Sequence, residues 1–249
     1  MRKLRDVFYI NANPLINEFV YYGLEFKEFI KFIPKAESLK NILLIDAEYY
    51  GTNFSEKYKF TIVDENEIDE LLSDDIYGYG NFTWVDVNDK NSIEKLEPSE
   101  VAELLYLGYM LKPVTTPFND KIQNRYAYLA HDDGWFCRLY CRNYSDFIEV
   151  VSNKIVNMVL TSRRVINPIS DDIKKQLLVL AENGLLIDFS NIMKYNRGIE
   201  IPIYTIGKFL DMDEMYNNLK RHIERANYSA KLIYKNKEWK IEYICQNLK

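Results

Sequence analysis

The sequence has few cysteines, prolines and glycines, the residues that crosslink a chain, interrupt helices and strands, or make the backbone flexible. It contains 3 cysteines, 9 glycines and 7 prolines among 249 residues. An odd, low number of cysteines in a chain this long does not make a disulfide framework and is typical of a reducing cytoplasm. Few glycines and prolines, with 47% hydrophobic residues, exclude a disordered or low-complexity chain. The sequence therefore predicts an ordered cytoplasmic protein that needs no metal or disulfide to fold.

Long hydrophobic runs and an excess of positive charge are also absent. The most apolar helix-like segment, residues 101–111, contains Glu103 and is shorter than the roughly 18 residues of a membrane-spanning helix. The N-terminus begins with basic residues like a signal peptide, but Asp6, Asn11 and Pro14 interrupt the apolar core. A net charge of −5 disfavours nucleic-acid binding, although it leaves room for a local basic patch. We expect neither a membrane segment nor a nucleic-acid partner.

Known catalytic signatures are missing as well. The sequence has no glycine-rich phosphate loop, no nucleophile elbow, no paired-histidine zinc helix and no calcium-loop spacing. Glu238-Trp239-Lys240 fits the end of a common nuclease signature, but its charged residues fall on the solvent face of a predicted strand. His222 lies between Lys and Arg neighbours on a predicted helix and reads as a surface residue. No cofactor and no metal are predicted, and the catalytic residues, if any, stay unidentified.

Helical and strand periodicities alternate along the chain, without a linker-like segment or an internal repeat. Asp64 with Glu67 and Asp211 with Glu214 have the spacing of capping boxes, and Pro98 suits a first helical turn. The expected fold is α+β, with a mixed or mainly antiparallel sheet flanked by helices. We expect a single domain over residues 1–249, with its weakest joint near 161–170. The predicted elements are strands at 41–46, 81–87 and 200–206, and helices at 64–72, 98–107, 144–160, 171–182 with a left-handed cap at Asn183-Gly184, and 211–223.

A β-hairpin is predicted at the C-terminus, over residues 228–244, with a two-residue turn at Asn236-Lys237. Alternating residues then form an apolar face and a charged face, as in a sheet with one side in water. The apolar pairs are Tyr234–Trp239, Leu232–Ile241 and Ala230–Tyr243, and the charged pairs are Lys235–Glu238 and Lys231–Glu242.

A second hairpin is predicted over residues 125–142, where Asp133-Gly134 separates two aromatic-rich runs. This dipeptide is a strong hairpin signal because a tight type I′ turn needs positive φ at both central residues. A two-residue loop places Phe136 opposite His131 and Cys137 opposite Ala130. One face is then a core face, formed by Tyr126, Tyr128, Ala130, Cys137, Leu139 and Cys141. The other is basic and aromatic and is expected to face solvent, formed by Arg125, His131, Phe136, Arg138, Tyr140 and Arg142.

This basic aromatic face is the best candidate for a site. Arginine presents a planar fork of donors that suits phosphate or carboxylate, and neighbouring aromatic rings can stack with it. The alternative interpretation is that the arginines only face solvent and form ion pairs with nearby acidic side chains, without a binding role. We predict a cytosolic binding or interaction protein whose partner is a small anionic ligand or an acidic protein. The predicted binding residues are His131, Asp132, Arg125, Arg138, Tyr140 and Arg142.

Three other interpretations use the same hairpin, namely a zinc site, a nucleic-acid surface and the active site of a hydrolase. His131, Cys137, Cys141 and Asp132 are zinc-ligand types, but the histidine lies on the other face and the cysteines are about 13 Å apart along a strand. They fit buried thiols better. A single-stranded nucleic-acid surface through Tyr140 and the arginines is disfavoured by the overall acidity.

The main alternative function is a small hydrolase with His131 as acid/base and an arginine as anion clamp. Its remaining carboxylates would come from the ends of predicted strands, at Asp46, Asp86 and Asp188. Asp132 and Asp133, which flank the histidine, are also residues that the turn itself favours.

Several blocks of the sequence together resemble a known family. They are residues 76–86 (IYGYGNFTWVD), 103–108 (ELLYLG), 128–135 (YLAHDDGW), 199–202 (IEIP) and 213–216 (DEMY). The family is an uncharacterised one of soluble proteins from Gram-positive bacteria, some of which carry the label oxalate:formate antiporter. The resemblance spans nearly the whole chain and implies one domain without an assigned activity. The transporter label does not fit a sequence that has no membrane span, and no functional residue is carried over.

Overall fold

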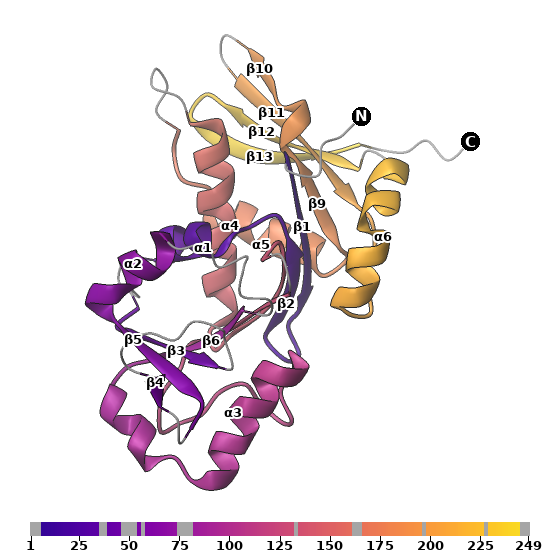
Figure 1. Cartoon of the computed structure of the whole chain (residues 1–249). Helices are drawn as coiled ribbons and strands as arrows, with labels where there is room; N and C mark the ends of the chain where they lie inside the picture. The colour runs from indigo at the N-terminus through magenta and orange to yellow at the C-terminus, as the bar shows by residue number, and fades with distance from the viewer. Residues whose placement is uncertain are drawn as a thin grey trace.

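The computed structural model describes residues 6–34, 39–45, 54–55, 58–73, 82–131, 134–160, 166–195, 198–226 and 229–244. Its strands form one continuous sheet in which every pairing is antiparallel. The strand order is β13-β12-β11-β9-β1-β2-β8-β7-β6-β3-β5-β4, with β10 paired to β11. Figure 1 shows the strand direction rotating from one end of the sheet to the other, the usual consequence of strand twist. The strands are β1 (Val7–Asn13), β2 (Glu18–Tyr22), β3 (Asn41–Ile45), β4 (Phe54–Ser55), β5 (Phe60–Asp64), β6 (Phe82–Val87), β7 (Tyr126–His131), β8 (Phe136–Cys141), β9 (Leu185–Asp188), β10 (Met193–Tyr195), β11 (Gly198–Thr205), β12 (Ala230–Lys235) and β13 (Glu238–Tyr243).

Helices cover both faces of this sheet, which confirms the α+β class with a mainly antiparallel sheet flanked by helices. One face packs against α1, α2, α4 and α5 around a large apolar core. The other packs against α3 and α6 around a second core. The helices are α1 (Phe26–Phe32), α2 (Ile68–Ser73), α3 (Pro98–Met110), α4 (Tyr144–Val159), α5 (Asp171–Ala181) and α6 (Met212–Arg225), with 3₁₀ turns at Glu65–Glu67, Lys90–Lys95 and Phe189–Asn191.

The centre of the sheet is the hairpin of β1 and β2, where the sequence patterns predicted no element. It lies between β9 and β8, so neither strand is an edge. Phe8 and Ile10 face the first core, whereas Val7 and Tyr9 face the second. A strand buried on both faces shows no alternation of polar and apolar residues, which is why periodicity does not reveal it.

Local signals in the sequence act in the structure as predicted. The Glu67 carboxylate accepts a hydrogen bond of 3.0 Å from the Asp64 backbone N–H, and Pro98 is the first residue of α3. The second predicted box differs in detail. The Asp211 carboxylate caps α6 by accepting from the Glu214 N–H at 2.8 Å, but the Glu214 carboxylate accepts from the N–H of Leu210.

The C-terminal hairpin has the predicted register, with Tyr234 opposite Trp239 and Lys235 opposite Glu238. Asn236 and Lys237 both have positive φ, as a type I′ turn requires. Lys231 lies opposite Glu242, but it forms a 2.8 Å ion pair with Glu200 on β11. The charged face is therefore also linked across β11 and β12.

Some predictions fall outside the described residues, namely Asp46 at the end of β3, the turn residues Asp132 and Asp133, and residues 161–165 of the expected joint. Within the described ranges, no helix combines the length and the apolar character that crossing a membrane requires.

The turn between α5 and β9 requires a glycine at position 184. Gly184 has φ +78°, and a Cβ at this position would lie 1.8 Å from the backbone oxygen of Gly207. Gly207 has φ +89°, but a Cβ there would meet nothing within 4 Å.

We predict that Gly184→Ala lowers the free energy of unfolding by roughly 3 kcal/mol, because a backbone clash adds to the strain of positive φ. The matched variant Gly207→Ala should cost only about 1 kcal/mol from φ strain. Urea unfolding of both variants tests this, and equal costs would contradict it.

Candidate functional site

The hairpin over residues 125–142 has the predicted register, with His131 opposite Phe136 and Ala130 opposite Cys137. Its predicted core face, which includes Cys137 and Cys141, is buried in the first core. The expectation that the other face lies in solvent holds for Arg142, which is exposed, but is wrong for Phe136, Arg138 and Tyr140. Phe136 and Tyr140 on that face are buried in the second core, together with residues of α3 and α6.

Arg138 is largely enclosed within this second face rather than turned toward solvent. Its side chain is 12% exposed, and its Nε lies 3.1 Å from an oxygen of Glu18 on β2. Its Nη1 donates to the backbone oxygen of Leu111, at the end of α3, at 2.8 Å. Tyr140 donates its hydroxyl hydrogen to the same Glu18 carboxylate at 2.9 Å, and burial raises the pKa of this hydroxyl. The charge of Arg138 is therefore neutralised inside the protein.

Arg125 and Arg142 lie at the opposite end of the hairpin from His131. The Nε of Arg125 is 3.1 Å from Asp86, whose other oxygen accepts from the backbone N–H groups of Arg125 and Tyr126. Burial raises the pKa of Asp86, and these hydrogen bonds and the guanidinium charge oppose that effect. Arg142 pairs with Asp120 at 3.1 Å. Both arginines already have carboxylate partners.

His131 lies at the edge of α6. Its Nε2 is 3.6 Å from the Asp213 carboxylate, and its ring lies 6.1 Å from that of Tyr216. Asp132, the remaining predicted binding residue, lies outside the described residues. The predicted binding residues thus do not converge, since a strand of six residues separates His131 from Arg125 by about 20 Å at roughly 3.3 Å per residue.

The other interpretations of the hairpin gain no geometric support. Within the described ranges, no three His, Cys, Asp or Glu side chains are grouped so that they could hold a metal ion. Asp86 is bonded to Arg125, and Asp188 accepts hydrogen bonds from Ser190 and Asn191, so neither approaches His131. Of the carboxylates expected to assist a catalytic His131, Asp86 and Asp188 are therefore occupied elsewhere, and Asp46 lies outside the described residues.

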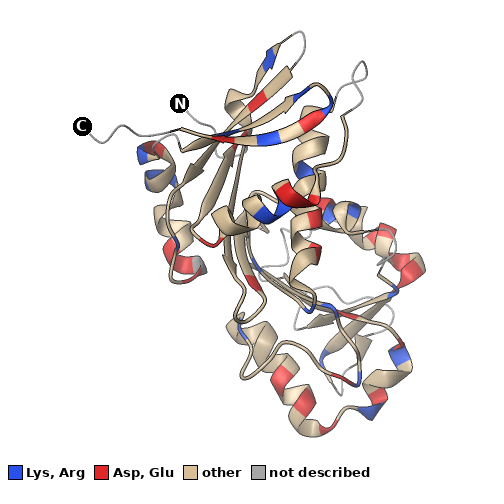
Figure 2. Ribbon diagram, turned by 180° about the vertical axis from the view of Figure 1, so that it is seen from behind, with Lys and Arg blue, Asp and Glu red and all other residues tan. Residues whose placement is uncertain are grey.

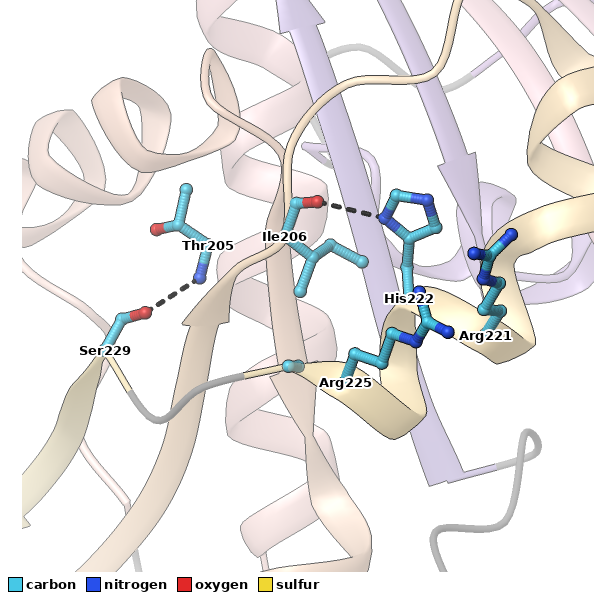
Figure 3. Close-up of a pocket in the computed structure, with 7 residues that line it drawn as sticks. Thr205, Ile206, Arg221, His222, Arg225 and Ser229 are labelled. Carbon is cyan, nitrogen blue, oxygen red and sulfur yellow. Dashed lines mark hydrogen bonds between the residues drawn. The ribbon is translucent and has the colours of Figure 1, made fainter.

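A cavity of about 580 Å³ lies at the other end of α6, where sequence reasoning predicted no site. β11 ends at Thr205, the chain turns through residues 206–211, and α6 returns so that its last turns lie beside Ile206. Ser229 enters β12 next to Thr205 and accepts a 3.1 Å hydrogen bond from the Thr205 N–H. Figure 3 shows how these segments surround the cavity, which is lined by Thr205, Ile206, Arg221, His222, Arg225, Ala226 and Ser229.

The charged side chains of this cavity come from a single helical face. Arg221 and Arg225 are one turn apart, and His222 lies beside them. Both arginines are exposed, and neither forms an ion pair with a described residue. No carboxylate is among the described residues that line the cavity. We call Arg221, His222 and Arg225 the basic triad.

Figure 2 shows acidic residues at the N-terminal end of α6 and basic residues toward its C-terminal end. This polarity suits the helix dipole, which favours cations in the last turn by about 0.3–1 kcal/mol. Basic residues at a helix end are common for this reason. The basic triad differs from an ordinary basic helix end in two ways. It lines a cavity, and no described residue forms an ion pair with Arg221 or Arg225.

The imidazole of His222 is partly buried against the loop after β11 rather than exposed as predicted. Its Nδ1 lies 3.3 Å from the backbone oxygen of Ile206, and the Phe209 ring meets it edge-on with centroids 4.9 Å apart. The one sequence feature that could have indicated this site is the spacing of Arg221, His222 and Arg225, which places them on one helical face. The sequence could not show that the loop after β11 would fold against that face.

Comparison of the chain with protein-family models, with curated proteins and with solved structures gives no match. The resemblance to a Gram-positive bacterial family therefore stays a prediction from the sequence blocks.

The two arginines Arg138 and Arg142 should differ sharply when their charge is removed. Arg138→Met leaves the largely buried Glu18 without its cation, so we predict a loss of about 3–5 kcal/mol in the free energy of unfolding. Arg142→Met removes an exposed ion pair and should cost no more than about 1 kcal/mol. Urea unfolding measures both. Similar costs for the two variants would show that Arg138 is not neutralised as the geometry indicates.

Proposed function

We propose that the protein binds a small anionic ligand, carrying a phosphate or carboxylate group, in the cavity between α6 and the ends of β11 and β12. The observation that carries this proposal is the pair of guanidinium groups, Arg221 and Arg225, that line a cavity without a described carboxylate. Arginine binds such groups through a planar fork of donors. The ligand class is the one predicted from the sequence, but its place is moved from the hairpin to α6.

The cost of leaving these arginines unpaired supports the proposal. Two like charges one helical turn apart destabilise a helix by about 0.2–0.5 kcal/mol. A bound oxyanion replaces that repulsion with two attractive contacts. By contrast, Arg125, Arg138 and Arg142 on the hairpin already satisfy carboxylates.

The size of the cavity favours a small molecule over an extended acidic partner. Its volume of about 580 Å³ lies within the roughly 300–1,000 Å³ typical of small-molecule sites. Ile206 and Ala226 add apolar surface to the lining, which suits an organic group attached to the anion. A cytosolic location is part of the proposal, and it is supported by Cys137 and Cys141, which are buried and not joined in a disulfide.

The test is binding of inorganic phosphate, measured by calorimetry and by the rise in melting temperature that a native-state ligand causes. We predict saturable binding that Arg221→Gln and Arg225→Gln each weaken roughly tenfold, because each removes one charge-assisted contact of about 1.5–3 kcal/mol. Lys220→Gln is the matched control, since it removes one positive charge from the same helix but from a residue that does not line the cavity. It should leave binding within about twofold, because exposed charges contribute little.

Two results would contradict the proposal. One is the absence of phosphate binding to the unmodified protein. The other is an equal loss of binding in Lys220→Gln and Arg225→Gln, which would mean that the helix attracts anions only through its general charge.

A further inference from the structure

His222 differs from the two arginines because its tautomer is fixed by the fold. Its Nδ1 lies 3.3 Å from the backbone oxygen of Ile206. A carbonyl oxygen only accepts hydrogen bonds, so Nδ1 carries the proton in the neutral ring. Figure 3 shows the other ring nitrogen on the side away from Ile206. In the neutral state this Nε2 is an acceptor, and His222 is one of the residues that line the cavity.

We infer that His222 makes the cavity a proton-dependent site for dianionic oxyanions, in which the imidazolium Nε2–H joins Arg221 and Arg225 as a third donor. This inference rests on the proposed function of the cavity and names how that site is regulated. A neutral Nε2 repels an oxyanion oxygen, whereas a protonated one donates to it. A phosphate or sulfate group presents its oxygens tetrahedrally to donors from different directions, and as a dianion it gains more from a third positive donor than a singly charged carboxylate does.

The surroundings of His222 strengthen the coupling between anion and proton. The charged groups that line the cavity with it are Arg221 and Arg225, also on α6. From β1, Tyr9 donates its hydroxyl hydrogen to the Gly207 oxygen at 2.8 Å, and burial raises the pKa of Tyr9, so it stays neutral.

No described residue that lines the cavity is a carboxylate. Three positive charges around an empty cavity repel one another, whereas a dianion attracts all three. Anion binding and proton binding therefore favour each other, as linkage requires.

The chain offers a direct test because it contains only 2 histidines, His131 and His222. Sulfate is the probe, since it stays a dianion across the range. Calorimetry at about pH 5.5 and about pH 8 brackets ordinary histidine titration. We expect sulfate to bind roughly tenfold more tightly at the lower pH. Between those values, the heat of binding should vary with the ionisation enthalpy of the buffer, which reports proton uptake.

Two variants assign the proton to one histidine. His222→Gln should bind sulfate with the weaker affinity at both pH values, because its amide does not titrate. His131→Gln is the matched control and should keep the full pH dependence, since His131 pairs with Asp213 at the opposite end of α6. Nitrogen NMR of the unmodified protein is a second readout that needs no variant. Sulfate should convert one of the two imidazoles toward the doubly protonated form.

The outcomes separate this inference from the proposed function. Sulfate binding that is equal at both pH values and takes up no proton overturns the role of His222 and leaves the arginine site standing. Loss of the pH dependence in His131→Gln also overturns it. Absence of sulfate and phosphate binding at either pH overturns the proposed function itself.

Discussion

Burial of the central strands on both faces is the constraint on which the other features of this structure depend. β1, β2, β8 and β7 lie side by side in the middle of the sheet, and their residues of both parities enter a core. A charged side chain on such a strand has little access to bulk water and is stabilised by a countercharge within the protein. Arg138 meets that need through Glu18, on the neighbouring β2. Arginines without a described ion pair lie instead at the surface, as Arg221 and Arg225 do near the C-terminal end of α6.

α6 connects the buried interior with that periphery. Met215, Leu219 and Ile223 repeat every four residues and close the second core. The basic triad occupies the adjacent face of the same helix, so packing of the apolar residues also fixes where the guanidinium groups and the imidazole lie. Asp211 caps the start of the helix, and Phe209 packs between Tyr9 and His222. The position of the cavity thus follows from the second core rather than from a separate binding module.

Most of the fold could be predicted from local signals, whereas the environment of the site could not. Turn chemistry and alternation give both hairpin registers correctly, because a slip of one residue would reverse every side chain. The β1–β2 hairpin escapes prediction because its residues are buried on both sides and show no period. Arg138 was wrongly expected to face solvent, because Glu18 is more than a hundred residues away in sequence and its pairing depends on strand order. His222 was wrongly expected to be a plain surface residue for a similar reason, since the Ile206 carbonyl that orients it belongs to another element.

The energetics of recruiting an arginine favour the proposed anion site on α6 over one on the hairpin. Freeing Arg138 would break a largely buried ion pair at a cost of about 3–5 kcal/mol. A new charge-assisted hydrogen bond to a ligand returns only about 1.5–3 kcal/mol, so the exchange is unfavourable. Arg221 and Arg225 have no described ion pair to break and lose at most about 2 kcal/mol each of rotamer entropy when they are fixed. In the proposed site, binding an oxyanion to these two arginines would break no described ion pair, and a protonated His222 would add a donor whose ring Ile206 and Phe209 already hold.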